Sequence, residues 1–554
     1  MNVAEFLQLQ ARERPDAIAI AEPIKGRWAN RKLPLKQRYR CLTFQELDDD
    51  SSRLAAGLHA MGIEQGTRLA LMIPPGCEFV SWVFAMFKAG MVSVLIDPGM
   101  GHKNMIDCLQ RVETEGFIGI SLVQAARTLL RSKFPAAKKN VTVGRRWFWR
   151  GPTANQLRRT EVGEFECFKP HPTDPAAIIF TTGSTGPPKG VHYCHQNFYH
   201  QVLQIQQQYG IEAGEKDLPA FPLFGLFNAA MGVATIIPKM DPTKPATVNP
   251  EHIIIPIQDW KVTQSFGSPA LWETVGRYCS ENHVRLPSLK RILSAGAPVP
   301  PRVLRRMRQA MAEDGDMHTP YGATESLPVA TISATEVLNE TAQKTAAGRG
   351  TCVGSRFSGI QWRVIQITDS PISDLEETTE VAVGEIGELI VQGPVVTSHY
   401  VTHAEETKLH KIPDGETFWH RMGDVGYFDS SGRFWFCGRK GHRVQLPNQT
   451  LFTIPTEAII NQHSRVYRCA VVTVMCRGTA EAAVVIECWP EHRTTSRADE
   501  QQLLDEIKRL AAENPLTSSI THFLLRDALP VDIRHNAKIF REKLSIWAQE
   551  KIGL

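Results

Sequence analysis

Residues 178–193 read IIFTTGSTGPPKGVHY, an apolar run that breaks into a turn rich in Thr, Ser and Gly. The apolar run predicts a strand, and the turn predicts a loop at its end. Gly183 and Gly186 can adopt backbone angles that other residues avoid, so the chain can wrap closely round a ligand. Lys189 adds a mobile positive charge. The hydroxyl groups expected to converge on anionic oxygens, together with backbone N–H groups, belong to Thr181, Thr182, Ser184 and Thr185. The stretch therefore predicts a strand that leads into a phosphate-binding loop.

The alternative interpretation is a Gly- and Ser-rich surface loop that happens to carry a lysine. The Walker phosphate loop is excluded, because Gly190 follows Lys189 at the place where that motif needs Ser or Thr. Other motifs along the chain decide between these interpretations.

The length and composition indicate an ordinary globular protein of more than one domain. A chain of 554 residues is too long for one compact core. Its hydrophobic content of 42% and charged content of 22% are typical of soluble proteins, and a net charge of +4 gives no reason to expect nucleic acid. Two basic segments, 25–40 and 145–151, leave nucleic acid or a membrane surface open as alternatives. A solvated hairpin is the preferred interpretation of the first, and aromatics packed on a neighbouring face that of the second.

The cysteines and the apolar segments bear on location. Eleven cysteines are scattered without a C-x-x-C pair, which indicates reduced thiols in a cytoplasmic protein and neither a disulfide framework nor a zinc site. The N-terminus has no apolar signal core. The most apolar segment, 79–87, is far shorter than the roughly 20 residues that span a bilayer, so no transmembrane segment is expected.

Predicted strands and helices alternate before the phosphate loop. Thr43 and Glu46 form a capping box that begins a helix through Leu58. Further on, 67–73 and 92–96 are typical of buried strands, and 79–88 is typical of a helix. This alternation predicts parallel strand pairing and an α/β fold.

Four further strings accompany the phosphate-loop string. They are SAGAP at 294–298, TPYGATE at 319–325, GDVG at 423–426 and LPVDIRHNAKIFREKL at 529–544. With TTGSTGPPKG at 181–190, their content and order resemble the adenylate-forming superfamily, which includes acyl-CoA synthetases, peptide-synthetase adenylation domains and luciferases. The resemblance implies a large α/β domain over 1–437, with mixed and parallel sheets sandwiched by helices. It also implies a hinge at 438–441, with Gly441 at the hinge place, and a small mobile α+β domain over 442–554.

The resemblance implies ATP and Mg²⁺ as cofactors and Lys189, Glu325 and Lys538 as catalytic residues. Lys189 would hold the outer phosphates, Glu325 would be the metal ligand, and Lys538 would bridge the substrate carboxylate and the α-phosphate. Asp424 would accept the ribose hydroxyls. The implied nucleotide-binding residues are Thr181, Thr182, Gly183, Ser184, Thr185, Gly186, Lys189, Gly296, Ala297, Pro298, Tyr321, Gly322, Ala323, Thr324, Asp424 and Arg439.

The resemblance places an acyl pocket at Phe224, Gly225 and Phe227. Family members commonly have His after the first aromatic, so Gly225 is expected to widen this pocket. The loop at 444–452 is longer than in thioester-forming relatives and lacks their glycine. This departure argues against a thioester product. Arg534, Asn536 and Ala537 also depart from the family pattern just before Lys538.

The strings FTTGSTGPPKGVHY and VDIRHNAKIFREKL are most similar to those of the bacterial olefin β-lactone synthetases. That group activates a long-chain 2-alkyl-3-hydroxyalkanoic acid as an acyl-adenylate, whose own 3-hydroxyl then closes a β-lactone with release of AMP. His192 or His195 is a candidate proton acceptor, with a packing or capping role as the alternative. The expected partners are the hydroxy acid and other enzymes of the same hydrocarbon pathway. Two alternatives stay open, a long-chain acyl-CoA or acyl-carrier synthetase and a catalytically silent nucleotide-binding protein.

Overall fold

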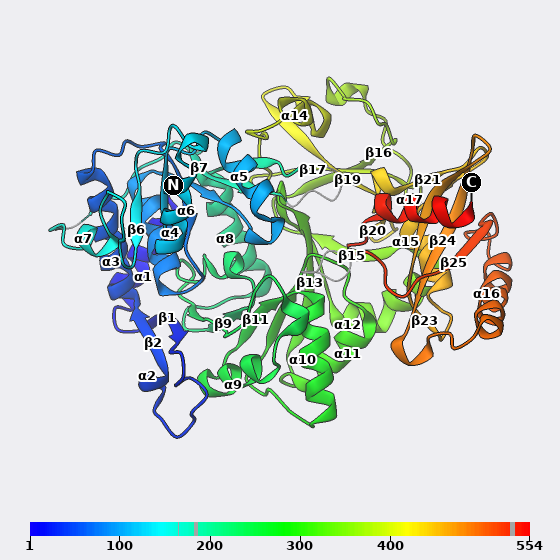
Figure 1. Cartoon of the computed structure of the whole chain (residues 1–554), viewed down its shortest axis with the longest axis horizontal. Helices are drawn as coiled ribbons and strands as arrows, with labels where there is room; N and C mark the ends of the chain where they lie inside the picture. The colour runs from blue at the N-terminus through cyan, green and yellow to red at the C-terminus, as the bar shows by residue number, and fades with distance from the viewer. Residues whose placement is uncertain (164, 182–186, 532–537, 554) are drawn as a thin grey trace.

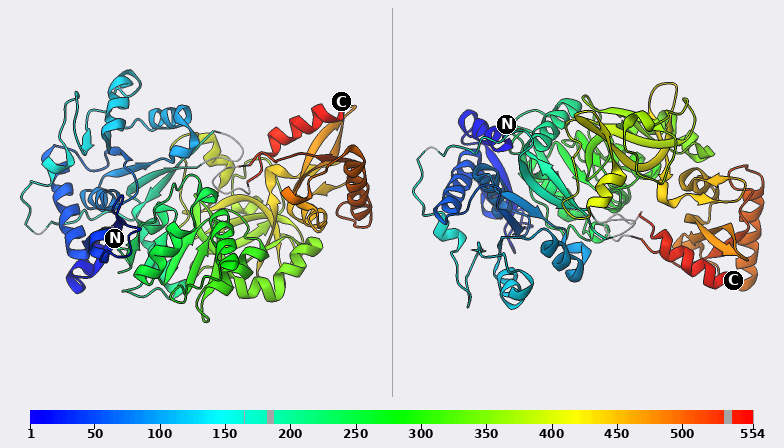
Figure 2. Two further views of the ribbon diagram at one scale, coloured as in Figure 1. Left: turned by 60° about the horizontal axis from the view of Figure 1, so that its bottom comes forward. Right: turned by 90° about the horizontal axis from the view of Figure 1, so that it is seen from above.

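A computed structural model describes residues 1–163, 165–181, 187–531 and 538–553. Two large sheets with helices on their faces make up most of the molecule, and the C-terminal region lies at one end (Figure 1). Figure 2 shows the same separation from two further sides, with residues 1–150 at the opposite end from the C-terminus. The predicted α/β fold is confirmed.

The first large sheet has six strands within the described residues, in the order β6-β5-β3-β4-β7-β8. All neighbours pair in parallel except β7 and β8, which pair antiparallel. Its strands are β3 (Arg68–Met72), β4 (Val92–Leu95), β5 (Gly116–Ile120), β6 (Val141–Val143), β7 (Pro175–Phe180) and β8 (Gly190–Cys194). The associated helices are α1 (Val3–Glu13), α3 (Phe44–Ala60), α4 (Cys77–Ala89), α5 (His102–Arg111), α6 (Ser121–Leu129), α7 (Ala154–Leu157) and α8 (His195–Tyr209).

Local signals explain these elements well. The predicted capping box forms, because the Thr43 hydroxyl accepts from the Glu46 backbone and the Glu46 carboxylate accepts from the Thr43 backbone. β7 ends at Phe180, so the strand predicted before the phosphate loop is confirmed. The loop residues 182–186 lie outside the described part of the chain.

The second large sheet has fourteen strands among the described residues, and β18 pairs only with β19. Its main path is β16-β17-β19-β20-β15-β14-β13-β12-β11-β9-β10-β1-β2. The strands that come first in the chain are β1 (Ile18–Pro23), β2 (Tyr39–Thr43), β9 (Lys216–Pro219), β10 (Ala234–Ile236), β11 (Gln264–Gly267), β12 (Arg291–Ser294) and β13 (Asp316–Ala323). The later strands are β14 (Ser326–Ser333), β15 (Thr351–Arg356), β16 (Gln361–Ile365), β17 (Gly387–Gln392), β18 (Lys411–Asp414), β19 (Thr417–Phe428) and β20 (Phe434–Arg439).

Helices cover this second sheet, and short helical segments connect its strands. The longer helices are α9 (Glu251–Trp260), α10 (Pro269–Glu281), α11 (Pro301–Ala310) and α14 (Ala404–His410). The shorter ones are α2 (Leu35–Arg38), α12 (Ala334–Glu336) and α13 (Ala342–Lys344). Leu271, Trp272, Leu304 and Met307 of α10 and α11 are buried in a core beneath β11 and β12. This core holds the strand ends that carry the SAGAP and YGATE strings in fixed positions.

The C-terminal region has its own sheet and its own apolar cores. β23 (Val466–Cys476), β24 (Thr479–Cys488) and β25 (His522–Leu525) form the sheet, preceded by a small hairpin of β21 (Val444–Gln445) and β22 (Thr450–Leu451). Its helices are α15 (Thr453–Ile460), α16 (Arg497–Ala512) and α17 (Arg541–Ile552). The two clusters that hold this region together draw only on residues 444–552. Such independent packing favours the division into 1–437, 438–441 and 442–554, which stays a prediction.

Two observations correct or limit the sequence analysis. In the basic segment 145–151 only Trp149 is buried, whereas Trp147 is 54% and Phe148 is 67% exposed. The interpretation that these aromatics pack on a neighbouring face is therefore wrong for two of the three. Among the described residues, no helix is both long enough and apolar enough to cross a membrane.

Candidate active site

A cavity of about 1180 Å³ lies where strand ends of both large sheets meet the C-terminal region. Strands β3, β4 and β7 of the first sheet contribute their carboxyl ends to its wall, as do Phe266 of β11 and the turn that follows β12 in the second. Arg439 at the end of β20 and Lys538 of the C-terminal region also line it. Ligands in open α/β sheets bind beyond the carboxyl ends of strands, so the position is typical of an active site.

The structure brings most of the predicted site residues to this one cavity. Those among its lining residues are Thr181, Lys189, Phe224, Phe227, Gly296, Ala297, Pro298, Tyr321, Gly322, Ala323, Thr324, Glu325, Asp424, Arg439 and Lys538. Thr182, Gly183, Ser184, Thr185 and Gly186 lie outside the described residues. The shared location supports the predicted site, while the individual roles stay predictions.

Lys189 is held by side chains that the sequence analysis missed. Its ammonium group donates to Glu406 at 2.6 Å, lies 3.5 Å from Nε2 of His410, and stands 5.3 Å from the ring centre of Tyr400. Burial and the charge of Lys189 lower the pKa of His410 to about 4, so this imidazole is neutral near pH 7. Glu406 is 217 residues from Lys189 in the chain, and no local pattern could have paired them.

Glu325 is positioned by Thr397 and Tyr400, whose contacts leave one carboxylate oxygen available. The Tyr400 hydroxyl donates to its Oε1 at 2.6 Å, and the backbone and hydroxyl of Thr397 both donate to its carbonyl. Its Oε2 accepts no hydrogen bond from any residue that the structure describes. A hard carboxylate oxygen on the cavity wall fits a Mg²⁺ ligand.

Asp424 receives a donor on each carboxylate oxygen. Arg439 donates to Oδ1 at 2.6 Å and to the carbonyl of Met422 at 3.0 Å, while the Tyr321 hydroxyl donates to Oδ2. Burial, reinforced by the Asp424 charge, raises the pKa of Tyr321 well above its usual value, so the hydroxyl keeps its proton. A carboxylate has about four acceptor positions, so this one retains capacity for two ribose hydroxyls.

Lys538 reaches the cavity from the C-terminal region. Three residues later, Arg541 forms an ion pair with Glu457 of α15 and donates to the carbonyl of Val471 on β23. Glu457 also accepts from the backbone of Val471 at 2.8 Å. These contacts fix the start of α17 and therefore the segment that carries Lys538. Arg534, Asn536 and Ala537, the departures from the family pattern, lie outside the described residues.

The acyl side of the cavity is aromatic, but Gly225 is not on its wall. Phe224 stacks on Phe266 with ring centres 3.7 Å apart, and both rings line the cavity with Phe227. A Cβ at position 225 would lie 2.5 Å from Cγ of Pro219. The glycine therefore permits close packing on Pro219, which is a different reason from the expected widening of the pocket.

The structure favours a packing role for His192 and His195. Neither is among the lining residues of the cavity. His195 is buried beside Phe87, and His192 stacks on His399 at 4.4 Å. Burial lowers the pKa of each to about 4. His410, His420 and His442 do line the cavity and were not singled out from the sequence.

The hinge residues differ in what the structure requires of them. Gly438 has φ +135°, and a Cβ there would lie 2.5 Å from the Thr453 hydroxyl, so this position needs glycine. Gly441 lies in the short turn Lys440–His442 with open space round it. Its assignment as the hinge stays a prediction.

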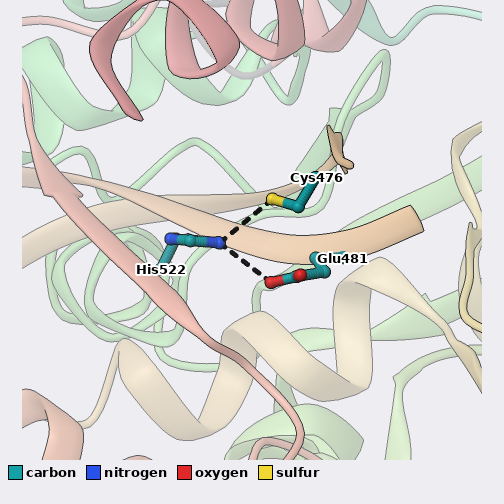
Figure 3. Close-up of side chains that lie close together, drawn as sticks. All are labelled: Cys476, Glu481 and His522. Carbon is teal, nitrogen blue, oxygen red and sulfur yellow. Dashed lines mark hydrogen bonds and ion pairs between the residues drawn. The ribbon is translucent and has the colours of Figure 1, made fainter. Parts of the chain in front are cut away.

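A second cluster of titratable side chains lies in the C-terminal region, outside the cavity. Nε2 of His522 lies 3.0 Å from Glu481 and 3.5 Å from the sulfur of Cys476 (Figure 3). These residue types can hold a metal ion, yet here the imidazole and its neighbours already satisfy one another. Burial and the nearby Glu481 raise the pKa of the Cys476 thiol, which keeps it protonated. The cluster has no connection to the predicted chemistry.

Comparison with known proteins agrees with the geometry of the cavity. Residues 7–401 match the model of a family described as AMP-binding enzyme. The chain belongs to the AMP-binding enzyme family. It is 43% identical to an olefin beta-lactone synthetase from Stenotrophomonas maltophilia, over all of this chain and 98% of that protein.

Two solved structures of CoA ligases have the same fold as this chain. The anthranilate CoA ligase AuaEII, in complex with anthranoyl-AMP, has a TM-score of 0.78 and 18% identity over all of this chain and 98% of that one. The O-succinylbenzoate coenzyme A synthetase of Bacillus subtilis, in complex with ATP and magnesium ion, has a TM-score of 0.72 and 19% identity over 97% of this chain and 98% of that one. At these identities the likeness concerns the fold, which the family assignment already explains.

Proposed function

We propose that this enzyme is an AMP-forming ligase that converts a long-chain 2-alkyl-3-hydroxyalkanoic acid into a β-lactone. The supporting observation is that Lys189, Glu325, Asp424, Arg439 and Lys538 line one cavity that also has an aromatic and aliphatic wall. The full-length similarity to the olefin beta-lactone synthetase of Stenotrophomonas maltophilia supports the product.

In the first half-reaction the substrate carboxylate attacks the α-phosphorus of ATP, giving an acyl-adenylate and pyrophosphate. Two anions must approach each other, so catalysis depends mainly on positioning and on neutralising charge. Lys189 holds the leaving phosphates, and Lys538 offsets the charge that grows at the α-phosphoryl group. Asp424, fixed by Arg439 and Tyr321, orients the nucleotide through its ribose.

ATP and Mg²⁺ are the proposed cofactors, with Glu325 as the metal ligand. When bound, the ion would neutralise phosphate charge. Tyr400 and Thr397 hold Glu325 in place for this purpose.

In the second half-reaction the 3-hydroxyl of the same substrate attacks the activated carbonyl. The carbonyl–oxygen bond to the phosphate breaks, AMP leaves with the electron pair, and the hydroxyl proton is lost. Because the nucleophile is already held in the molecule, its effective concentration is high and no thiol needs to enter. The segment where thioester-forming relatives have a glycine forms the short β21–β22 hairpin here, closed by a bond from the Leu446 N–H to the carbonyl of Gln449.

We also retain the division at 438–441 and the partnership with other enzymes of the same hydrocarbon pathway as predictions. The second candidate function is a long-chain acyl-CoA or acyl-carrier synthetase. It is favoured only by the general similarity to CoA ligases such as AuaEII.

The test is incubation of the enzyme with ATP, Mg²⁺ and a long-chain 2-alkyl-3-hydroxy acid, with and without CoA. We expect AMP and a β-lactone in equal amounts, detected by mass spectrometry and NMR, and no stimulation by CoA. A matched acid without the 3-hydroxyl should be adenylated but give no lactone. Accumulation of a CoA thioester without lactone would replace this proposal with the synthetase alternative.

A further inference from the structure

Four large apolar side chains are exposed at the edge of the first sheet, and we call them the aromatic face. They are Leu122 and Leu129 of α6, 68% and 78% exposed, with Trp147 and Phe148 of the loop after β6. Leu122 and Leu129 are seven positions apart and so lie on one side of the helix. Exposed apolar side chains are usually scattered singly over a protein surface. A group of four on one side therefore indicates an interaction site.

The structure holds this face in place. The buried Trp149 donates its indole N–H to the Thr142 hydroxyl at 2.8 Å, and its ring lies within 5.5 Å of the rings of Trp147 and Phe148. The Ser121 hydroxyl donates to the carbonyl of Arg145, which joins the loop to the first turn of α6. Packing of α6 on β6 brings helix and loop together, at the end of the molecule remote from the C-terminal region (Figures 1 and 2).

The surrounding chain is strongly basic. Residues 116–160 contain ten Lys and Arg and no Asp or Glu, although the whole chain has a net charge of only +4. The rest of the protein is therefore net negative. Arg145, Arg146 and Arg150 are exposed and form no ion pair with any described residue. Positive charge is thus concentrated where the aromatic face lies.

The aromatic face also lies close to the active-site cavity. Ile120 and Val123, on either side of Leu122 in the chain, line that cavity. The first turn of α6 therefore borders the cavity on one side and carries Leu122 of the aromatic face on the other. Single-stranded nucleic acid also binds aromatic and basic surfaces, but it stacks on aromatics and gains nothing from exposed leucines beside a lipid-sized cavity.

We propose that the aromatic face docks on an anionic lipid surface. Tryptophan favours the boundary between lipid headgroups and hydrocarbon, aliphatic and phenyl groups insert beneath it, and Arg and Lys are attracted to anionic headgroups. Apolar insertion and basic attraction together give reversible binding that neither provides well alone. This inference goes beyond the proposed reaction, and its test uses no substrate or nucleotide, so it can fail independently.

The experiment measures sedimentation of the full-length enzyme with vesicles of phosphatidylcholine, with and without phosphatidylglycerol. We expect binding to the anionic vesicles that falls at high salt, with a blue shift of tryptophan emission. Trp147→Ser with Phe148→Ser, and separately Arg145→Gln with Arg146→Gln, should each weaken binding by about tenfold or more. Thermal unfolding and ATP–pyrophosphate exchange should be unchanged, because none of these residues lines the cavity.

Matched control variants remove the same types of side chain from other parts of the protein surface. Ile546→Ser removes an exposed aliphatic side chain on α17, and Arg305→Gln with Arg497→Gln removes two exposed arginines. These variants should bind vesicles like the unchanged enzyme. Equal binding to neutral and anionic vesicles, or full binding by the aromatic-face variants, would overturn the proposal. So would binding of a single-stranded RNA, but not of vesicles, through the same residues.

Discussion

Strands β19 and β20 carry two groups of opposite charges that differ in how completely they are satisfied. Arg421, with 1% of its side chain exposed, forms an ion pair with the fully buried Glu388 at 2.6 Å, and Lys440 joins Glu388 at 3.1 Å. Arg421 also donates to the carbonyls of Thr368, Ser370 and Leu409. Three residues after Arg421, Asp424 binds Arg439 and Tyr321 on the cavity wall and keeps acceptor capacity.

The difference separates a structural group from a binding group of similar composition. In the Arg421 group the cationic donors are met by protein oxygens, and the oxygen without a hydrogen bond among the described residues, Oε1 of Glu388, is fully buried. In the Asp424 group two donors fix the carboxylate while open acceptor positions remain for hydroxyls. The number of charged residues therefore says less about function than the acceptor positions that the protein leaves open toward the cavity.

The largest expected effect concerns the structural group. Glu388→Ala leaves Arg421 buried without its carboxylate, which should lower the free energy of unfolding by about 3–5 kcal/mol. Urea unfolding followed by circular dichroism measures this, with the exposed Glu376→Ala as control. An unchanged free energy of unfolding would mean that Arg421 does not need Glu388 as a partner. The Arg421 group would then not be a structural group.

The next effect concerns charge in the cavity. Lys538→Ala should slow adenylate formation by about 10²–10³-fold, roughly 3–4 kcal/mol, because a cation that acts in the transition state is lost. ATP binding and unfolding should change little. ATP–pyrophosphate exchange measures the rate, with Lys551→Ala, an exposed lysine on the following helix α17, as control. Near-normal exchange would remove Lys538 from the catalytic residues.

A smaller effect should distinguish ribose binding from structure at Asp424. Asp424→Ala should weaken ATP by about 1.5–3 kcal/mol, the usual worth of hydrogen bonds to a charged group. It should affect 2′,3′-dideoxy-ATP much less, since that nucleotide has no hydroxyls to donate. Calorimetric titration of both nucleotides gives the answer, and equal losses would place Asp424 with the structural group.

The most gradual effect, small for each pH unit, concerns Lys411, a buried cation without a carboxylate partner among the described residues. Its ammonium group donates to the carbonyl of Thr397, and burial lowers its pKa to about 7, against the opposing charge of Glu325. From about pH 7 to its unfolded pKa near 10.4, the unfolded chain binds the proton and the folded chain does not. Folding stability should therefore rise with pH in this window, by at most about 1.4 kcal/mol per pH unit.

Unfolding of the unchanged enzyme and of Lys411→Met, compared from pH 6.5 upward, isolates this contribution. The difference in stability should shift in favour of the unchanged enzyme as pH rises. A difference that stays constant across the window would show that Lys411 keeps its charge in the folded protein.

Much of the fold followed from local sequence. The capping box at Thr43 and the strand before the phosphate loop depend on residues a few positions apart. Short motifs likewise located most of the polar residues proposed for the cavity wall. No local sequence pattern predicted the hydrogen-bond and ion-pair partners of those residues.

Glu406, Tyr400 and His410 lie more than 200 residues after Lys189 and meet it only through the folded sheets. The exposure of Trp147 and Phe148 was also unpredictable, since a run of aromatics is compatible with either side of a loop. Gly225 was interpreted from the family alone, whereas its packing on Pro219 depends on the backbone of β9.

The ion pair between Lys189 and Glu406 has a consequence for the effect of ionic strength. Before ATP binds, Glu406 neutralises the lysine, so a phosphate group must replace an anion that the protein itself supplies. Dissolved salt weakens the attraction of Lys189 both to Glu406 and to the phosphate. These two effects on nucleotide affinity have opposite signs and partly cancel. Nucleotide affinity should therefore depend less steeply on salt concentration than it would for an unpaired lysine. A small free anion, with a single contact to offer, gains little by displacing Glu406, whereas a polyphosphate with several contacts can do so.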